Sequence, residues 1–128
     1  PDLLIVRFDS QLYFGNSGYF KSELFKFINV KGRSLKAVIL NAEAINYIDA
    51  SASAVLINVI EEIHNRNIEF YIAGATGPIR DIIFKSGIIN SLHKEYLFVR
   101  IKEAVAYHDD PNTIPSLREK VAYQNQSN

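Results

Sequence analysis

The most informative absence in this 128-residue chain is cysteine, which does not occur at all. Without cysteine the chain cannot form a disulfide, present a thiolate nucleophile or bind a metal through sulfur. This composition fits a reducing compartment. Methionine is also absent, including an initiator methionine before Pro1. We therefore expect an excised fragment or a processed chain.

Long apolar runs are missing as well. No stretch approaches the roughly 20 apolar residues that a helix needs to cross a bilayer. The first residues, Pro1-Asp2-Leu3-Leu4, lead into apolar sequence with no basic region ahead of it, which argues against a secretory signal peptide. We expect no direct membrane insertion of these residues.

The chain has no excess charge of either sign, because 14 basic and 14 acidic residues cancel. A neutral chain has no overall attraction for nucleic acid or anionic lipid, so we expect no nucleic-acid partner. What the chain does have is a 48% apolar content, which is sufficient for one domain of this length to form a core.

The N-terminal half predicts strands and helices in alternation. Residues 3–8 are typical of a buried strand and residues 12–14 of a second short strand, so we predict an N-terminal β-hairpin. Apolar residues at helical spacing follow from Phe20 and end near Asn29. Residues 35–40 predict a central strand that is buried on both faces.

The second half continues the alternation. Beyond Asp49 an amphipathic pattern predicts a helix, and Gly77-Pro78 predicts another, with proline at the first helical position. Two further strands and a last helix are predicted at residues 69–73, 97–99 and 101–107. The order predicts an α/β fold: a mixed, mostly parallel β-sheet with about four packed α-helices.

The same periodicity predicts the core and the extent of the domain. The buried stripes and strands supply the core, namely Val38, Ile39, Leu40, Val55, Leu56, Val59, Ile63, Ile72, Ile79, Ile82 and Ile83. We predict one domain over residues 1–108. The following residues, 109–128, contain two prolines and a polar end, which predicts a peripheral or disordered tail.

The start of the amphipathic helix is the first candidate site, and it comprises Asp49, Ala50, Ser51, Ala52 and Ser53. Free backbone N–H groups and the helix dipole favour an anion at such a place. The simpler interpretation is that Asp49 or Ser51 is an N-cap, which stabilises a helix by about 1 kcal/mol. Helix caps are common, so spacing alone favours the cap.

The second candidate site is the next strand-to-helix junction, with Gly74, Thr76 and Gly77. Ligands of open α/β sheets bind at the carboxyl ends of strands, so the two junctions could line one polar cleft. The segment is not a phosphate loop, because no lysine follows the second glycine. A glycine-permitted turn is the simpler interpretation.

No catalytic or metal-binding motif is found. His64, His93 and His108 do not pair at a spacing of four, and no HExxH motif occurs. The serines lie in no GxSxG motif. We therefore expect no cofactor, no metal and no enzymatic activity.

Several ordered motifs resemble the STAS domains of SulP-type anion transporters over about residues 3–107. The motifs are Arg7-Phe8-Asp9, Leu12-Tyr13-Phe14-Gly15-Asn16, Ala37-Val38-Ile39-Leu40, Tyr47-Ile48-Asp49-Ala50-Ser51-Ala52, Ile72-Ala73-Gly74, Phe84-Lys85-Ser86-Gly87-Ile88 and Leu97-Phe98. The LYFGN segment is similar to the transporter branch of the family.

The resemblance implies a STAS fold and a cytosolic domain behind a membrane transport domain, at the cytoplasmic face of the plasma membrane in a bacterium. The implied cargo is sulfate, bicarbonate or a dicarboxylate. The implied partners are the membrane domain of the same transporter and a cytosolic regulatory protein. The related free-standing proteins are anti-sigma-factor antagonists that are switched by phosphorylation of the serine directly after the motif aspartate.

This chain departs from that pattern at two positions. Ala50 occupies the position of the switch serine, so we expect no phosphorylation there, and Asn41 stands where an aspartate is common. The leading interpretation is therefore a regulatory module of a transporter. The alternatives are a free-standing partner-switching protein and a weak nucleotide-binding module.

Overall fold

In the computed structural model, which describes residues 2–9, 11–12 and 14–112, three parallel strands form a sheet in the order β1-β2-β3. The strands are β1 (Leu3–Arg7), β2 (Ala37–Asn41) and β3 (Glu69–Ala73). Their registers are aligned, because Leu3 pairs with Ala37 and Ala37 pairs with Glu69. The carboxyl ends of all three strands therefore lie at one edge of the sheet.

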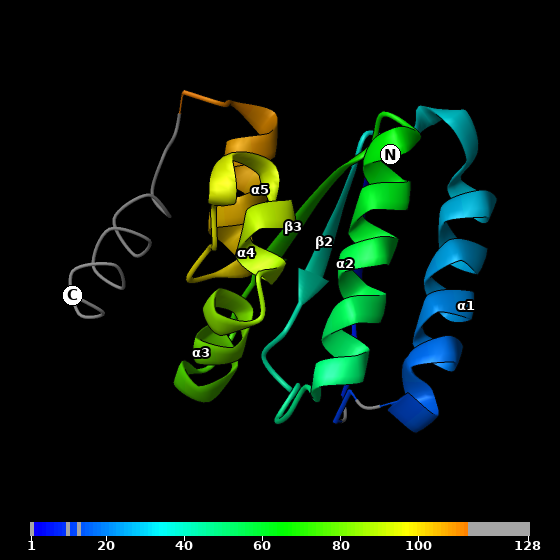
Figure 1. Cartoon of the computed structure of the whole chain (residues 1–128). Coiled ribbons are helices and arrows are strands. Elements are labelled where there is room, and N and C mark those ends of the chain that lie inside the picture. Colours follow the sequence, from blue (N-terminus) through cyan, green and yellow to red (C-terminus); the bar gives the residue numbers. More distant parts are fainter. Residues whose placement is uncertain (1, 10, 13, 113–128) are drawn as a thin grey trace.

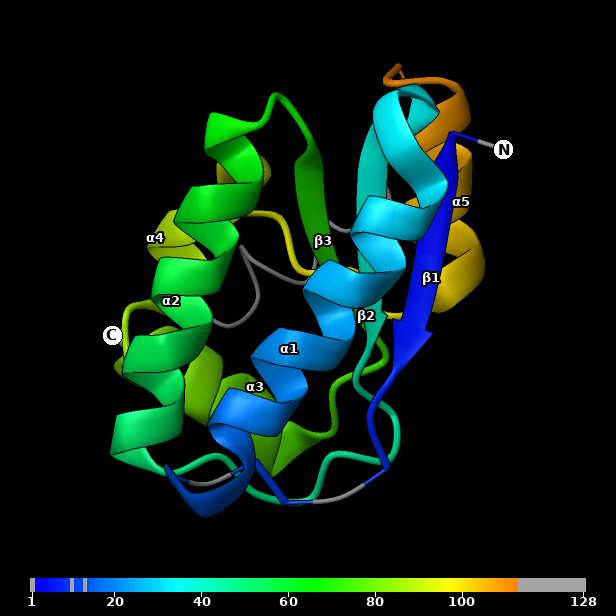
Figure 2. The same ribbon diagram turned by 90° about the vertical axis from the view of Figure 1, so that its right-hand side faces the viewer.

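Helices follow each strand. They are α1 (Phe14–Lys31), α2 (Ala50–Asn65), α3 (Gly77–Lys85), α4 (Ile88–Ser91) and α5 (Ile101–Asp109), with 3₁₀ turns η1 (Gly32–Ser34) and η2 (His93–Glu95). Figures 1 and 2 show α1 and α2 side by side on one face of the sheet and α5 on the other. The expected α/β layering is confirmed.

The strands supply both cores by alternation, since successive side chains point to opposite faces. Val38 and Leu40 belong to the larger core beneath α1 and α2. Ala37 and Ile39 belong to a smaller core beneath α5, with Tyr71, Phe98 and Tyr107. Of the residues predicted for the core, all are buried except Val55 and Ile82, which are partly buried.

The predicted N-terminal hairpin is wrong. Leu12 forms an isolated parallel bridge with Ile48 instead of pairing with the first strand, and Phe14 already begins α1; Tyr13 lies outside the described residues. A run of three apolar residues is too short to distinguish the period of a strand from that of a helix. Leu12 is nevertheless buried, at 1% exposure. Its apolar side chain therefore reflects packing in the core and not a place in a hairpin.

Two other expectations need correction. The described sheet is entirely parallel instead of mixed, and the strand expected at residues 97–99 is only a bridge between Phe98 and Ala73. The number of helices also differs, because the described residues form five α-helices, including the short α4, where about four were expected. Gly87 precedes α4 with a φ of 89°, a conformation that glycine adopts without strain. Most of the predicted tail, residues 113–128, lies outside the described residues.

Candidate functional site

The start of α2 has the geometry of a capped helix. Asp49 is the N-cap residue in extended conformation, and its Oδ1 accepts a hydrogen bond from the Ala52 N–H at 2.7 Å. The Asp49 N–H donates to the Leu12 carbonyl at 3.0 Å. The cap satisfies one of the free donors at the helix start. Of the two capping residues considered from the sequence, Asp49 has this role.

The residues after Asp49 divide between surface and interior. Ala50 and Ser51 are exposed, whereas Ala52 and Ser53 are buried at 0% and 4% exposure. The Ser53 hydroxyl has no hydrogen-bond partner among the described residues. The chemical surface at this helix start therefore consists of Ala50 and Ser51 beside the Asp49 carboxylate.

The second junction is closed by its own neighbours. Gly74 has a φ of 81°, and its N–H donates to the Phe98 carbonyl at 3.1 Å. A Cβ at this position would come within 2.6 Å of the Glu43 Cγ. Thr76 is the exposed N-cap of α3 but makes no side-chain cap hydrogen bond. Gly74 is thus required by the turn and by the close approach of Glu43.

The structure brings both junctions to the carboxyl edge of the sheet, as expected from the order of elements (Figure 1). Their immediate neighbours differ, since the first contacts Leu12 and the second contacts Glu43 and Phe98. The two junctions therefore lie at the same edge of the sheet but pack separately. That they line one ligand cleft remains a prediction.

An ion network at the same edge could not be found from the sequence. Arg7, at the end of β1, forms an ion pair with Asp9 and a longer one, of 3.9 Å, with Glu43. The hydrogen bond and charge of Asp9 raise the pKa of Arg7 above its usual value. The residues after two different strands meet here only because the strand registers are aligned.

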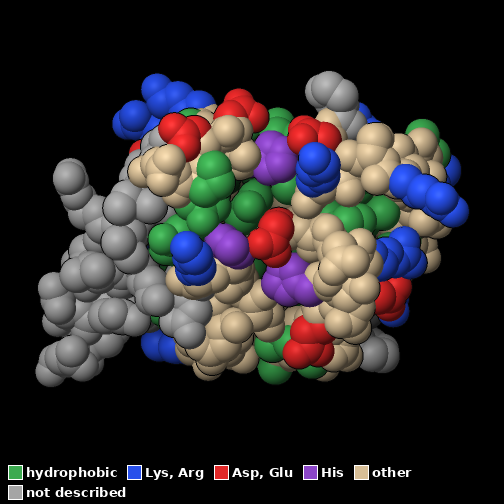
Figure 3. All heavy atoms as spheres, turned by 90° about the horizontal axis from the view of Figure 1, so that it is seen from above, with side chains coloured by type: hydrophobic (Ala, Val, Ile, Leu, Met, Phe, Trp, Pro, Cys, Tyr) green, Lys and Arg blue, Asp and Glu red, His purple; other side chains and the backbone are tan. Residues whose placement is uncertain are grey.

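A second polar cluster lies at the opposite, amino edge of the sheet. Nδ1 of His93 is 2.7 Å from a Glu69 carboxylate oxygen, and its Nε2 is 2.9 Å from the Tyr107 hydroxyl. His64 lies 3.7 Å from the same carboxylate. Figure 3 shows histidine and acidic side chains gathered on this face. Burial raises the pKa of Tyr107 above its usual value.

Within residues 2–9, 11–12 and 14–112, no group of three or more histidine, aspartate or glutamate side chains has the arrangement of a metal site. The helices in this part of the chain include none that is both long and apolar enough to span a membrane.

Comparison with known proteins places this geometry in one family. The family model described as STAS domain matches residues 1–107. Probable sulfate transporter 4.2 of Arabidopsis thaliana is 31% identical over an alignment of 112 residues, with 80% of this chain and 16% of the relative covered. This chain therefore corresponds to about a sixth of the length of that relative.

Solved structures share the fold. A sulfate transporter family protein from Wolinella succinogenes has a TM-score of 0.69 at 23% identity, with 83% of this chain and 84% of that chain covered. The murine Slc26a9 anion transporter in its inward-facing state has a TM-score of 0.70 at 21% identity, with 83% of this chain and 17% of that chain covered.

Proposed function

The chain belongs to the STAS domain family, and from that premise we propose that it is the non-catalytic regulatory domain of a SulP-type anion transporter. Its place would be the cytoplasmic face of the plasma membrane, behind the transport domain of the same protein. The transported anion would belong to the sulfate, bicarbonate or dicarboxylate class. The observation that carries the proposal is the family match together with the 31% identity to a sulfate transporter.

The proposed contact with the membrane domain is the carboxyl edge of the sheet at the start of α2. Ala50 and Ser51 are exposed there, and Tyr47, three residues before Ala50 in the chain, is 49% exposed. An exposed aromatic residue near a helix start supports a contact role, since aromatic residues are enriched at protein interfaces. Ser53, considered as a contact on sequence grounds, is buried and drops out of this surface.

We propose that this face docks without a phosphorylation switch at position 50. A phosphate on a helix-start serine adds about 1.5 to 2 negative charges, here beside the Asp49 carboxylate. Ala50 has no hydroxyl to accept one. Shape and the polar atoms of the half-buried Asp49 and the exposed Ser51 would then govern docking. A cytosolic regulatory protein is the second candidate partner for the same face.

The experiment is Ala50→Glu in the full-length transporter that carries this domain, with uptake of the anion that the wild-type transporter carries, tested among sulfate, bicarbonate and dicarboxylates, as the readout. The substitution places a negative charge where the phosphate would be, so uptake should fall while circular dichroism of the isolated chain stays unchanged. Ala106→Glu is the matched control, because Ala106 is an exposed helical alanine on α5. Normal uptake by a folded Ala50→Glu protein would exclude this face as the contact.

A further inference from the structure

Two histidines share the carboxylate of Glu69 at the amino edge of the sheet. Oε1 of Glu69 lies 3.7 Å from Nε2 of His64, in the last turn of α2. Oε2 of Glu69 lies 2.7 Å from Nδ1 of His93, in η2, and Nε2 of His93 lies 2.9 Å from the Tyr107 hydroxyl of α5. One carboxylate thus connects the end of α2, the start of β3, η2 and, through His93, α5.

The two histidines differ in how the neutral ring is satisfied. A neutral imidazole has one donor and one acceptor nitrogen. Both are used at His93, where Nδ1–H donates to Glu69 and Nε2 accepts from the Tyr107 hydroxyl. At His64, Nε2 is buried and has no hydrogen-bond partner among the described residues. The neutral form is therefore complete at His93 and incomplete at His64.

Proton uptake has opposite consequences for the two rings. A charged imidazole donates from both nitrogens, so a charged His93 no longer accepts from Tyr107, whose side chain is 3% exposed. The hydroxyl hydrogen would then be buried without an acceptor, which is costly. A charged His64 loses no such bond, gains an attraction to Glu69, and is 31% exposed to water. The geometry therefore favours His64 as the proton acceptor.

The tyrosines around His93 do not change charge in the same pH range. Tyr71 of β3 and Tyr96, which follows η2, each pack edge-on against the His93 ring with centroids 6.1 Å apart. Tyrosine has a usual pKa of about 10, and burial raises the pKa of Tyr71 and Tyr107 further. Histidine changes charge between about pH 5 and 8. The two histidines are therefore the groups of this cluster that respond near neutral pH.

The neighbouring charged groups are engaged elsewhere or exposed. Arg66, directly after α2, donates hydrogen bonds to Asn29 and Glu62. The Lys36 carbonyl accepts from the Glu69 N–H at 2.9 Å, and the Lys36 side chain is exposed. The short α4, which packs beside η2, has no titratable side chain. Lysine and arginine stay charged throughout the range in which histidine titrates, so their effect on the cluster is constant.

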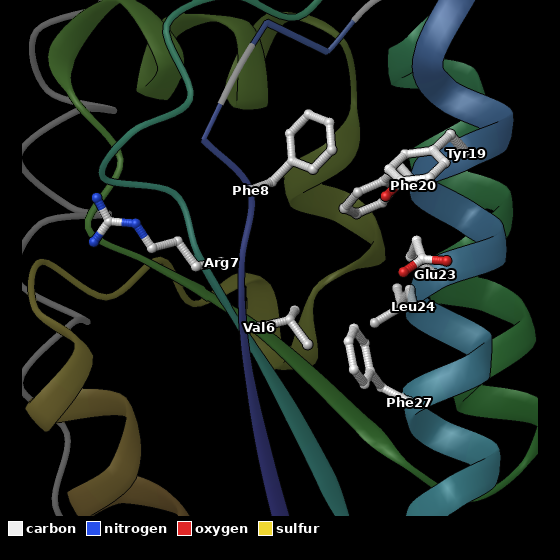
Figure 4. Close-up of a pocket in the computed structure, with 8 residues that line it drawn as sticks. All are labelled: Val6, Arg7, Phe8, Tyr19, Phe20, Glu23, Leu24 and Phe27. Atoms are coloured by element: carbon white, nitrogen blue, oxygen red, sulfur yellow. The ribbon is translucent and has the colours of Figure 1, made fainter.

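The groove between β1 and α1 offers no comparable response. It has a volume of about 170 Å³, and Figure 4 shows Val6 and Phe8 on its strand side and Tyr19 on its helix side. The described residues that line it include no histidine. Its charged residues are Arg7 and Glu23, and arginine and glutamate keep their charges between about pH 5 and 8. A response to pH near neutrality therefore belongs to the amino edge.

Backbone strain marks the same place. Among the described residues, the non-glycine residues with positive φ are Asn67, at 62°, and Lys94, at 52°. Asn67 lies in the turn between His64 and Glu69, and the exposed Lys94 directly follows His93. A left-handed conformation is unfavourable for a residue such as lysine, and strain of this kind gathers at switch regions. η2 can therefore relax once its contact with β3 weakens.

We propose that Glu69 and its two histidines form a proton-operated latch on η2. While His64 is neutral, the carboxylate holds His93, and η2 and α5 stay bound to the sheet. A proton that His64 takes from water draws Oε1 across the 3.7 Å gap towards the length of a charge-assisted hydrogen bond, about 2.8 Å. A carboxylate is rigid, so Oε2 moves with Oε1 and its contact with His93 lengthens. The latch adds a response to pH, at the edge opposite the proposed docking face, to the proposed transporter function.

Long-range ¹H–¹⁵N NMR of the 128-residue chain with ¹⁵N-labelled histidine tests the latch. Ring nitrogen shifts distinguish the two neutral tautomers from each other and from the charged form. At about pH 8 we expect a neutral His93 with its proton on Nδ1, and as the pH falls to about 5.5 His64 should become charged before His93. A neutral His93 with its proton on Nε2, or a His93 that becomes charged first, would overturn the proposal.

Exchange of the His93 Nδ1 proton with water measures the release. At about pH 6 it should be about tenfold faster in wild type than in His64→Gln, because only wild type can take up the proton at position 64. His108→Gln is the matched control, since His108 lies at the same edge but pairs with Asp2, and it should behave as wild type. Equal rates in wild type and His64→Gln would contradict the latch. If His64→Gln fails to fold, the wild-type tautomer and order of charging decide. Neither readout involves transport, so the latch and the transporter function can fail separately.

Discussion

Asp2 and His108 are 106 positions apart in the sequence, yet Nε2 of His108 lies 3.2 Å from Oδ1 of Asp2. The contact joins the residue just before β1 to the last turn of α5, on the far face of the sheet. Both termini of the described domain are thereby tied to the amino edge of the strands. The hydrogen bond to His108, followed by its charge, lowers the pKa of Asp2 below its usual value.

This pKa shift predicts a dependence of stability on pH. A carboxylate whose pKa is lowered in the folded state stabilises the fold above its unfolded pKa, about 3.9 for aspartate. The contribution is lost as the pH falls through the lower, folded value. Asp2→Asn should therefore be less stable than wild type at pH 5 to 7, and the difference should shrink towards pH 2.

Urea unfolding at a series of pH values measures that difference. Asp109→Asn is the matched control, because Asp109 is an exposed carboxylate at the end of α5, and it should show no comparable trend. A stability difference for Asp2→Asn that is constant over the whole pH range would contradict the assigned contact.

Val59 provides a test of the predicted core. It has 0% exposure in the middle of α2 and belongs to the larger core. Val59→Asp would bury an unpaired charge and should reduce the free energy of unfolding by on the order of 4 kcal/mol. Asn58→Asp, at the exposed neighbouring position, should stay within about 0.5 kcal/mol. Thermal melts that differ by only a few degrees would refute the placement.

Glycines at two positions should respond to alanine with opposite signs. Gly74→Ala forces a left-handed conformation at a φ of 81° and a contact with Glu43, so it should destabilise the fold by about 1 to 2 kcal/mol. Gly18 lies inside α1 with nothing within 4 Å of an added Cβ. Gly18→Ala should stabilise by about 0.5 to 1 kcal/mol. Chemical denaturation of both variants provides the comparison, and equal signs would be the contrary result.

If this chain binds an anion, we predict that it does so at the starts of α2 and α3. We expect amide shifts on titration with GDP or GTP to centre on residues 50–54 and 74–79, because both segments carry free N–H groups at strand ends. Two-dimensional NMR of the labelled chain would show them. Shifts confined to the amino edge, around Glu69 and His93, would rule out this location.

The chain should not hydrolyse ATP or GTP. It has no GxxxxGK[ST] loop, and no metal-binding group is found among its described residues, so neither usual means of activating a phosphate is recognised. Phosphate release in the presence of Mg²⁺ should equal the protein-free background. Turnover that is lost in Thr76→Ala would reverse the non-catalytic assignment.

The sequence by itself determined most elements of this fold. Periods of apolar residues located α2, α3 and the buried strands β2 and β3, because a helix or strand that packs on a core must repeat its apolar side chains at a fixed interval. Local chemistry fixed the helix starts at Asp49 and Gly77-Pro78, since capping depends on the residues within one turn. The same local motifs were sufficient to recognise the STAS family.

Only the tertiary structure decided how distant segments meet. Leu12 pairs with Ile48 and not with the first strand, because backbone pairing depends on which edges lie adjacent in space and no local pattern encodes this. The ion pair of Arg7 with Glu43 and the contact of Glu69 with His93 have the same origin. Each depends on strand order and register, which follow from packing the whole chain and not from any single segment of it.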